Sequence, residues 1–214
     1  MEVKGVVFDL DDTLVYMDPK YRYDTVGSAL SELGVKGIDN NTIDEFWYDL
    51  HRNKFISEVF GVPYNDFWEK FAEKENVEVR RRFTKFYKDA RILKYLKKIG
   101  IKTGILTSAP INIRDMEIEL LDYVFDGVIT ANYKNGIKEK PNPEGLLLCL
   151  DSMKIGIQSA IMVGNGLEDI LTGKAAGVID VLIDRGNYKS DVVPTYRIDS
   201  LMKLRKLFFD NKSV

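Results

Sequence analysis

Short apolar runs and amphipathic stretches alternate along much of the chain. Several runs rich in valine, isoleucine and leucine have the composition and length of strands buried on both faces. They occupy residues 3–8, 101–106, 124–130, 159–163 and 178–183. Between them, residues 90–99 and 111–121 carry apolar side chains at helical spacing. Strands that alternate with helices predict an α/β fold with a parallel sheet. A short edge strand at 196–198 and a closing helix at 201–208 complete the prediction.

Residues 16–88 differ from this alternation. They are rich in aromatic and charged residues, and their apolar positions recur at helical spacing. The four predicted helices cover residues 24–33, 41–58, 64–74 and 78–87. Aromatic stripes at helical spacing are typical of the core of a small helical unit. The sequence therefore predicts a helical insertion between the first strand and the second.

Three polar residues of this insertion are candidates for contact with a substrate, namely His51, Arg52 and Lys54. His51 is the only histidine in the chain, and a lone histidine on a helix is more often a packing or surface residue than a functional one. Residues 80–82 are all arginine. Because successive helical positions point in different directions, we expect these arginines to form a solvated face.

The composition limits the class of protein. Of the 214 residues, 45% are hydrophobic and 30% are charged, which suits a protein with a sizeable core. The net charge is -2, so bulk charge indicates neither a nucleic-acid nor a membrane partner. Cys149 is the only cysteine, and no apolar run reaches the length of a membrane span. A predicted strand stands where a signal peptide would lie, so we expect a soluble, cytoplasmic protein.

The first predicted strand ends in acidic residues. The run V-V-F-D-L-D-D-T covers residues 6–13 and places Asp9 and Asp11 directly after the strand. The carboxyl ends of parallel strands open into the crevice where α/β proteins bind ligands. Acidic residues after a strand also form solvated turns and helix caps, so the pattern alone favours chemistry only modestly. At these residues the chain resembles the haloacid dehalogenase-like (HAD) hydrolases, whose first motif is an apolar strand followed by D-x-D-x-T.

Two later segments resemble the second and third motifs of that family. Thr107 ends the second predicted strand, as does the hydroxyl residue of the second motif, and Ser108 stands where the family often has asparagine. The run K-P-N-P at residues 140–143 resembles the third motif. The resemblance makes Lys140 the cation that holds phosphoryl oxygens, with Lys138 as the alternative.

The run G-N-G-L-E-D at residues 164–169 resembles the acidic fourth motif. Asn165 stands at the first acidic position of that motif, and Asp169 keeps the second. An amide oxygen can bind Mg²⁺ but lacks the charge that would hold the ion. We therefore expect this replacement to weaken metal binding.

The resemblance spans the chain and implies a fold and a function. The fold is α/β, a doubly wound parallel sheet in a Rossmann-like HAD core of residues 1–15 and 89–214, with a small α-helical cap domain at residues 16–88. Within the family, the phosphoglycolate-phosphatase-like branch carries a helical cap at this place. The implied function is Mg²⁺-dependent hydrolysis of a small phosphorylated metabolite, a phosphate monoester, through an aspartyl-phosphate. A ligand set of oxygens alone selects Mg²⁺ over zinc.

The resemblance also implies a role for each motif residue. Asp9 is the nucleophile, and Asp11 is the general acid and then the general base. Thr107 and Lys140 steady the transferring phosphoryl group. The residues that we expect to contact the rest of the substrate are Ser108, His51 and Arg52. The expected metal ligands are Asp9, Asp11, Asn165 and Asp169.

Two alternatives stay open. A phosphomutase of the same family uses the same motifs and differs in its cap. A non-catalytic binding protein on the same scaffold is suggested only by Asn165, and the presence of the other motif residues argues against it. A haloacid dehalogenase is disfavoured, because those enzymes lack the second aspartate that Asp11 supplies here. The sequence leaves the physiological substrate and the oligomeric state open.

Overall fold

The computed structural model describes residues 2–49, 51–186, 188 and 190–209. The chain forms two compact units, and each is described by itself. Unit 1 comprises Met1–Tyr16 and Phe86–Val214, and unit 2 comprises Met17–Lys85. The assignment of residues 16–88 as a cap stays a prediction.

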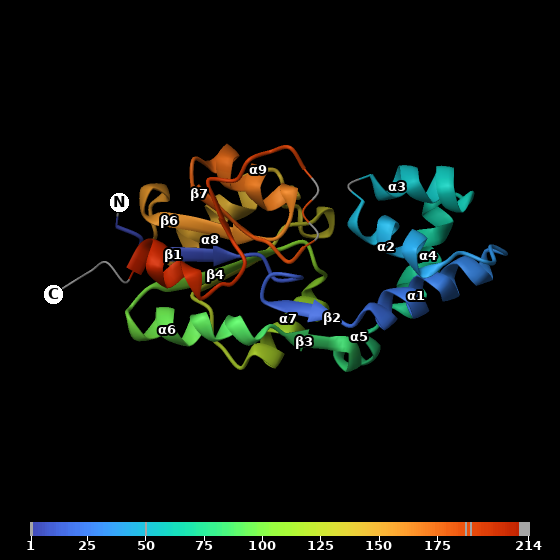
Figure 1. Ribbon diagram of the computed structural model, residues 1–214, viewed down its shortest axis with the longest axis horizontal. Coiled ribbons are helices and arrows are strands. Elements are labelled where there is room, and N and C mark those ends of the chain that lie inside the picture. The colour runs from blue at the N-terminus through green and yellow to red at the C-terminus, as the bar shows by residue number, and fades with distance from the viewer. Residues whose placement is uncertain (1, 50, 187, 189, 210–214) are drawn as a thin grey trace. The chain divides into compact units, whose positions relative to one another are not determined.

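Unit 1 is built on a parallel sheet (Figure 1). Within the described residues, six strands lie in the order β5-β4-β1-β6-β7-β8, and each neighbouring pair is parallel. The strands are β1 (Gly5–Phe8), β4 (Lys102–Thr107), β5 (Gly127–Thr130), β6 (Ala160–Gly164), β7 (Ile179–Ile183) and β8 (Tyr196–Ile198). Each corresponds to a predicted strand, and the predicted α/β fold class is confirmed.

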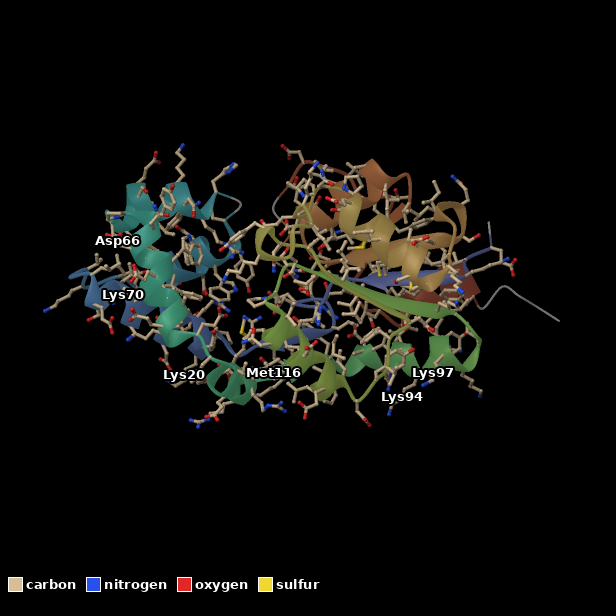
Figure 2. All side chains as sticks on the ribbon, turned by 180° about the vertical axis from the view of Figure 1, so that it is seen from behind. Lys20, Asp66, Lys70, Lys94, Lys97 and Met116 are labelled. Atoms are coloured by element: carbon tan, nitrogen blue, oxygen red, sulfur yellow. The ribbon has the colours of Figure 1, made fainter. Side chains whose placement is uncertain are left out.

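Helices cover both faces of this sheet (Figure 1). They are α6 (Ile92–Lys98), α7 (Ile111–Leu121), α8 (Glu144–Met153) and α9 (Leu167–Ala176). Alternate residues of β1 point to opposite faces, so Val6 and Phe8 pack in the core that contains α6, while Val7 packs in the core that contains α8. Lys94 and Lys97 lie on the outer side of α6 (Figure 2). The sheet is therefore doubly wound, as predicted.

Short helical turns complete unit 1. Three are 3₁₀ turns, namely η2 (Lys88–Arg91), η3 (Tyr133–Asn135) and η4 (Ile157–Ser159). The predicted closing helix ends in a π-helical turn, η5 (Arg205–Phe209). Among the described residues, no helix is both long enough and apolar enough to cross a membrane.

The strand order brings three loops to one edge of the sheet. β1 lies between β4 and β6, and Phe8 is the register partner of both Ile105 and Val163. Because the strands are parallel, their carboxyl ends share one edge. The loops that carry the first, second and fourth motifs therefore begin side by side.

Unit 2 is helical. Its helices are α1 (Pro19–Glu32), α2 (Asn40–Tyr48), α3 (Arg52–Phe55), α4 (Tyr64–Lys74) and α5 (Val77–Phe83), with a π-helical turn η1 (Ile56–Phe60) after α3. Phe46 and Phe67 lie in the middle of its apolar core, with ring centroids 5.4 Å apart. The aromatic stripes therefore form a core, as predicted.

Two helix predictions in unit 2 are wrong. The helix predicted at 41–58 is broken after Tyr48, because the Asp49 side chain accepts a hydrogen bond from the backbone N–H of His51 and so replaces the helical pattern with a local turn. The helix predicted at 24–33 begins at Pro19, where Asp18 caps the first turn.

The end of unit 2 also differs from the prediction. The helix predicted at 78–87 stops at Phe83, and the chain continues as strand β3 (Thr84–Phe86), which pairs with β2 (Val15–Met17). Arg80 is buried and pairs with Glu75 at 2.8 Å, so the arginine run does not form a uniformly solvated face.

Candidate active site

The chain reverses direction directly after β1. The backbone N–H groups of Thr13, Leu14 and Val15 all donate to the carbonyl of Leu10, at 3.3, 3.0 and 3.1 Å. Asp12 has φ of 53° in this turn, a left-handed conformation that aspartate tolerates better than most residues. The turn holds Asp9 at the end of the strand and folds Thr13 back toward it.

Lys140 joins two carboxylates that are far apart in the sequence. Its Nζ lies 2.7 Å from Asp9 Oδ1 and 2.6 Å from Asp169 Oδ1. The three side chains are 7%, 8% and 2% exposed, respectively. Hydrogen bonds of this kind between charged groups are roughly twice as strong as neutral ones. The structure thus brings the first, third and fourth motifs together, with Lys140 rather than the exposed Lys138 at the centre.

The Thr13 hydroxyl links Asp9 to the fourth motif. Thr13 Oγ1 lies 3.1 Å from Asp9 Oδ2 and 3.3 Å from Asn165 Oδ1. A hydroxyl has one proton, so it donates to one of these oxygens at a time. Thr13 was not among the residues predicted to form the site. It is the last residue of D-x-D-x-T, four positions after Asp9, where the chain has turned back toward the strand end.

The position of Asp169 depends on Gly164 and on the backbone of residue 166. The backbone N–H of Gly166 donates to Asp169 Oδ2 at 3.0 Å, which fixes the carboxylate that Lys140 contacts. A Cβ atom added to Gly164 would lie 2.2 Å from the Asp169 carboxyl carbon. Position 164 must therefore be glycine for Asp169 to lie against the strand end.

The buried cluster shifts the ionisation of its members. Burial raises the pKa of the Asp9 carboxyl to about 8, against the lowering effect of Lys140, and the charge of Asp169 adds to the rise. Burial disfavours the charged form of Lys140, but Asp169 and Asp9 outweigh it and raise the pKa of the ammonium group. Lys140 is therefore a fixed cation, and a further cation beside Asp9 would stabilise its carboxylate form.

Oxygen atoms suited to a hard cation surround Asp9. Asp9 Oδ2 and Asn165 Oδ1 share the same Thr13 hydroxyl, and oxygen donors are those that Mg²⁺ prefers. Two carboxylates face only one ammonium group at Lys140, so the cluster favours added positive charge. In the part of the chain that the structure describes, no three His, Cys, Asp or Glu side chains are grouped for a metal ion. The oxygen atoms of Asp9 and Asn165 are donors of the kind that fits Mg²⁺.

The other predicted residues of unit 1 lie in the neighbouring loops. Thr107 is buried at the end of β4, and its Oγ1 accepts a hydrogen bond from the Ala109 N–H at 3.1 Å. Ser108 is exposed, and its carbonyl accepts from the Asn132 side chain at 3.4 Å. Asp11 is half-buried in the turn after β1. Asp11 acts on the cluster through its charge, which adds to the rise in the pKa of Asp9.

His51 and Arg52 belong to unit 2. Both side chains are exposed, and they lie at the start of α3, where the predicted helix is broken. The His51 side chain does not cap that helix. Their assignment as substrate-binding residues stays a prediction.

Comparison with known proteins agrees with this geometry. Residues 6–183 match the family model described as haloacid dehalogenase-like hydrolase. A protein of Caldanaerobacter subterraneus subsp. tengcongensis, provisionally named pyrophosphatase PpaX, is 28% identical over 219 residues, which cover 97% of this chain and 95% of the relative. The crystal structure of a HAD phosphatase from Thermococcus onnurineus is similar with a TM-score of 0.63 and 28% identity, covering 97% of each chain.

A further solved structure shares the fold. It is a protein of Lactobacillus plantarum, provisionally named phosphoglycolate phosphatase, with a TM-score of 0.77 and 20% identity, covering 97% of this chain and 100% of the other. The family match includes the strand that carries Asp9 and the loops that carry Lys140 and Asp169. The chain is therefore a member of the haloacid dehalogenase-like hydrolase family, and it is an enzyme.

Proposed function

We propose that this protein is a Mg²⁺-dependent phosphatase that hydrolyses a small phosphate monoester through an aspartyl-phosphate on Asp9. The observation that supports this most directly is the position of Lys140 Nζ, within 2.7 Å of Asp9 and 2.6 Å of Asp169. A cation beside a nucleophilic carboxylate attracts the phosphate group that the carboxylate alone would repel. The relatives named as phosphatase and pyrophosphatase support the same class of reaction, the hydrolysis of a bond to a phosphoryl group.

The proposed reaction has two steps. The Asp9 carboxylate attacks phosphorus, the bond to the ester oxygen breaks, and Asp11 donates a proton to that leaving oxygen. In the second step Asp11 removes a proton from water, which attacks the phosphorus and releases phosphate and free Asp9. Lys140 and Thr107 hold the phosphoryl oxygens in both steps. Thr13 fixes the Asp9 carboxylate through its hydroxyl.

Asp9 and Asn165 supply the metal-binding oxygens in this proposal. Asp11 and Asp169 stay predicted ligands, and both oxygens of Asp169 already accept hydrogen bonds, from Lys140 and Gly166. Bound Mg²⁺ would neutralise charge on the phosphoryl oxygens. The neutral amide of Asn165 lowers the charge at the metal, so we expect weak binding of Mg²⁺.

A second candidate substrate is inorganic pyrophosphate, because one relative carries the name pyrophosphatase. The same residues could act, since the leaving group would be a phosphate instead of an alcohol. The predicted phosphomutase would transfer the phosphoryl group from Asp9 to a second hydroxyl of a sugar phosphate. These three reactions share Asp9 and differ in the acceptor or the leaving group.

One assay separates these possibilities. The protein is incubated with p-nitrophenyl phosphate, phosphoglycolate, sugar phosphates and pyrophosphate, with Mg²⁺ or with a chelator. Released phosphate is measured, and the sugar phosphates that remain are identified. We expect phosphate release from at least one monoester that requires the metal. Release from pyrophosphate alone would select the second candidate, and conversion of a sugar phosphate without phosphate release would select the mutase. No reaction with any substrate would contradict the proposal.

A further inference from the structure

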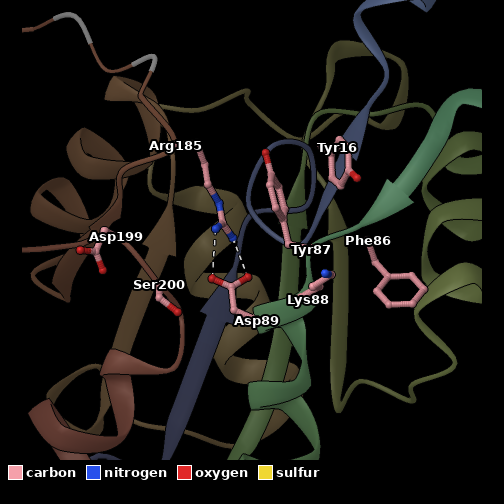
Figure 3. Close-up of a pocket in the computed structure, with 8 residues that line it drawn as sticks. All are labelled: Tyr16, Phe86, Tyr87, Lys88, Asp89, Arg185, Asp199 and Ser200. Atoms are coloured by element: carbon pink, nitrogen blue, oxygen red, sulfur yellow. Dashed lines mark hydrogen bonds and ion pairs between the residues drawn. The ribbon is translucent and has the colours of Figure 1, made fainter.

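Arg185 follows strand β7 and contacts two segments of unit 1 at once (Figure 3). Its Nη1 and Nη2 donate to the two carboxylate oxygens of Asp89, each at 3.0 Å. Nη2 also donates to the backbone carbonyl of Thr13 at 2.9 Å. The guanidinium lies over the ring of Tyr87, 3.7 Å from its centroid. Arg185 is a charged residue near the carboxyl end of a strand, and its sequence position alone did not mark it as functional.

These contacts require an arginine. The paired bonds to Asp89 match the planar fork of a guanidinium, and stacking on Tyr87 uses its flat face. The side chains of Arg185 and Asp89 are 11% and 15% exposed, so the ion pair is shielded from solvent. A lysine at position 185 offers a single ammonium group, and it would have to choose between Asp89 and the Thr13 carbonyl.

Asp89 is itself held in place. Its Oδ2 accepts a hydrogen bond from the Leu201 N–H at 2.9 Å. Two residues earlier, the Tyr87 N–H donates to the Leu14 carbonyl at 2.9 Å. The segment that carries Tyr87 and Asp89 is therefore hydrogen-bonded both to Leu14, in the turn after Asp9, and to Leu201.

The Thr13 carbonyl connects Arg185 to the nucleophile. The backbone carbonyl of Thr13 accepts a hydrogen bond from Arg185, and the hydroxyl of Thr13 donates one to Asp9 or Asn165. We propose that Arg185 is a positioning residue: it fixes the Thr13 backbone, and thereby the hydroxyl that orients Asp9 and Asn165. This inference rests on the proposed function of Asp9. Displacement of about 1 Å at a reacting group can lower a rate by about a hundredfold.

A cavity of about 470 Å³ adjoins the guanidinium, lined in part by Tyr16, Tyr87, Lys88 and Arg185. Removal of the Arg185 side chain would enlarge this space. A guanidinium ion from solution could then occupy the place of the missing group between Asp89 and Thr13. The cavity therefore allows a chemical rescue experiment.

The test compares Arg185→Ala with Arg197→Ala. Arg197 also forms an ion pair, with Asp184 at 2.6 Å, but its side chain is 56% exposed. At a temperature where each protein is folded, we expect Arg185→Ala to lower kcat at least about tenfold with KM nearly unchanged. Guanidinium chloride at low concentration should restore part of the loss. Arg197→Ala should keep kcat and show no rescue.

Arg185→Lys keeps the test valid if Arg185→Ala does not fold, because it preserves the charge and loses only the fork. We expect its kcat to lie between those of wild type and Arg185→Ala. Folded variants at position 185 with kcat within about twofold of wild type would overturn the inference. An equal fall in the kcat of Arg185→Ala and Arg197→Ala would also overturn the inference.

A second readout does not depend on activity. Amide hydrogen exchange in residues 9–15 is measured without substrate, and we expect it to be faster in Arg185→Ala than in wild type or Arg197→Ala. Unchanged exchange would overturn the positioning role. A third outcome combines faster exchange in Arg185→Ala with a wild type that hydrolyses no phosphate ester. This result would overturn the proposed function but support the link between Arg185 and the turn after Asp9.

Discussion

Replacement of Lys140 by methionine tests the buried cluster directly. Methionine has nearly the same length and fills the space, so the variant removes the charge with little change in volume. Lys140 Nζ lies 2.7 Å from Asp9 Oδ1 and 2.6 Å from Asp169 Oδ1, so these two oxygen atoms are at most 5.3 Å apart, the sum of the two distances. Two ionised carboxylates at that separation would repel each other by about 3 kcal/mol at an effective dielectric constant of about 20, so loss of Lys140 raises the pKa of Asp9 further. Breaking a buried ion pair costs a similar amount, about 3–5 kcal/mol.

This cost predicts a clear shift in unfolding temperature. For a chain of this size, about 3 kcal/mol corresponds to roughly 6–12 °C. The matched control is Lys138→Met, since Lys138 lies in the same loop and is exposed, and its change should stay within about 0.5 kcal/mol. Added Mg²⁺ should stabilise Lys140→Met more than wild type, because the ion then replaces the positive charge missing beside Asp9 and Asp169.

Both effects can be followed by thermal unfolding in a chelator and in Mg²⁺. The activity of Lys140→Met should fall about a hundredfold or more, as for loss of a group that stabilises transition-state charge. Equal unfolding temperatures for Lys140→Met and Lys138→Met in the chelator would refute the reasoning from burial and charge.

Three further predictions concern neighbouring groups. Asn165→Asp should lower the Mg²⁺ concentration needed for half-maximal activity, with less effect at saturating metal; indistinguishable Mg²⁺ titrations would place Asn165 away from the metal. Gly164→Ala should lower the unfolding temperature and the activity, because the new Cβ meets the Asp169 carboxyl group, and wild-type values for both would contradict this contact. Burial raises the pKa of Asp89, but hydrogen bonds from Arg185 outweigh burial and hold this pKa below its ordinary value. The ion pair should therefore stabilise unit 1 above about pH 4, and this stabilisation should be lost as the pH falls further. Denaturant titrations from about pH 5 to about pH 3 should show a smaller loss of stability in Asp89→Asn than in wild type.

The sheet was predictable because it depends on local patterns. Val6, Val7 and Phe8 form an uninterrupted apolar run, which indicates a strand buried on both faces whatever lies next to it. Asp9 and Asp169 follow strands whose carboxyl ends share one edge, whereas the place of Lys140 beside them was expected only from the resemblance of K-P-N-P to the third motif.

The remaining features depend on contacts between distant residues. The burial of Arg80 follows from its pairing with Glu75, and no periodicity in the arginine run reveals it. The break after Tyr48 follows from the Asp49 side chain, which competes for a backbone N–H in a segment without glycine or proline. Arg185 lies 172 residues after Thr13, and only the fold brings its guanidinium to that carbonyl.

If Asp9 is the nucleophile, it carries the phosphoryl group between the two steps, and this group can be trapped. Wild type is mixed with a substrate that it hydrolyses and Mg²⁺, quenched in acid within one turnover, and mapped by mass spectrometry. We expect one phosphoryl group on the peptide that contains Asp9 in wild type, and neither that group nor turnover in Asp9→Asn. A phosphoryl group on another residue, or near-full Mg²⁺-dependent activity in Asp9→Asn, would show that Asp9 is not the nucleophile.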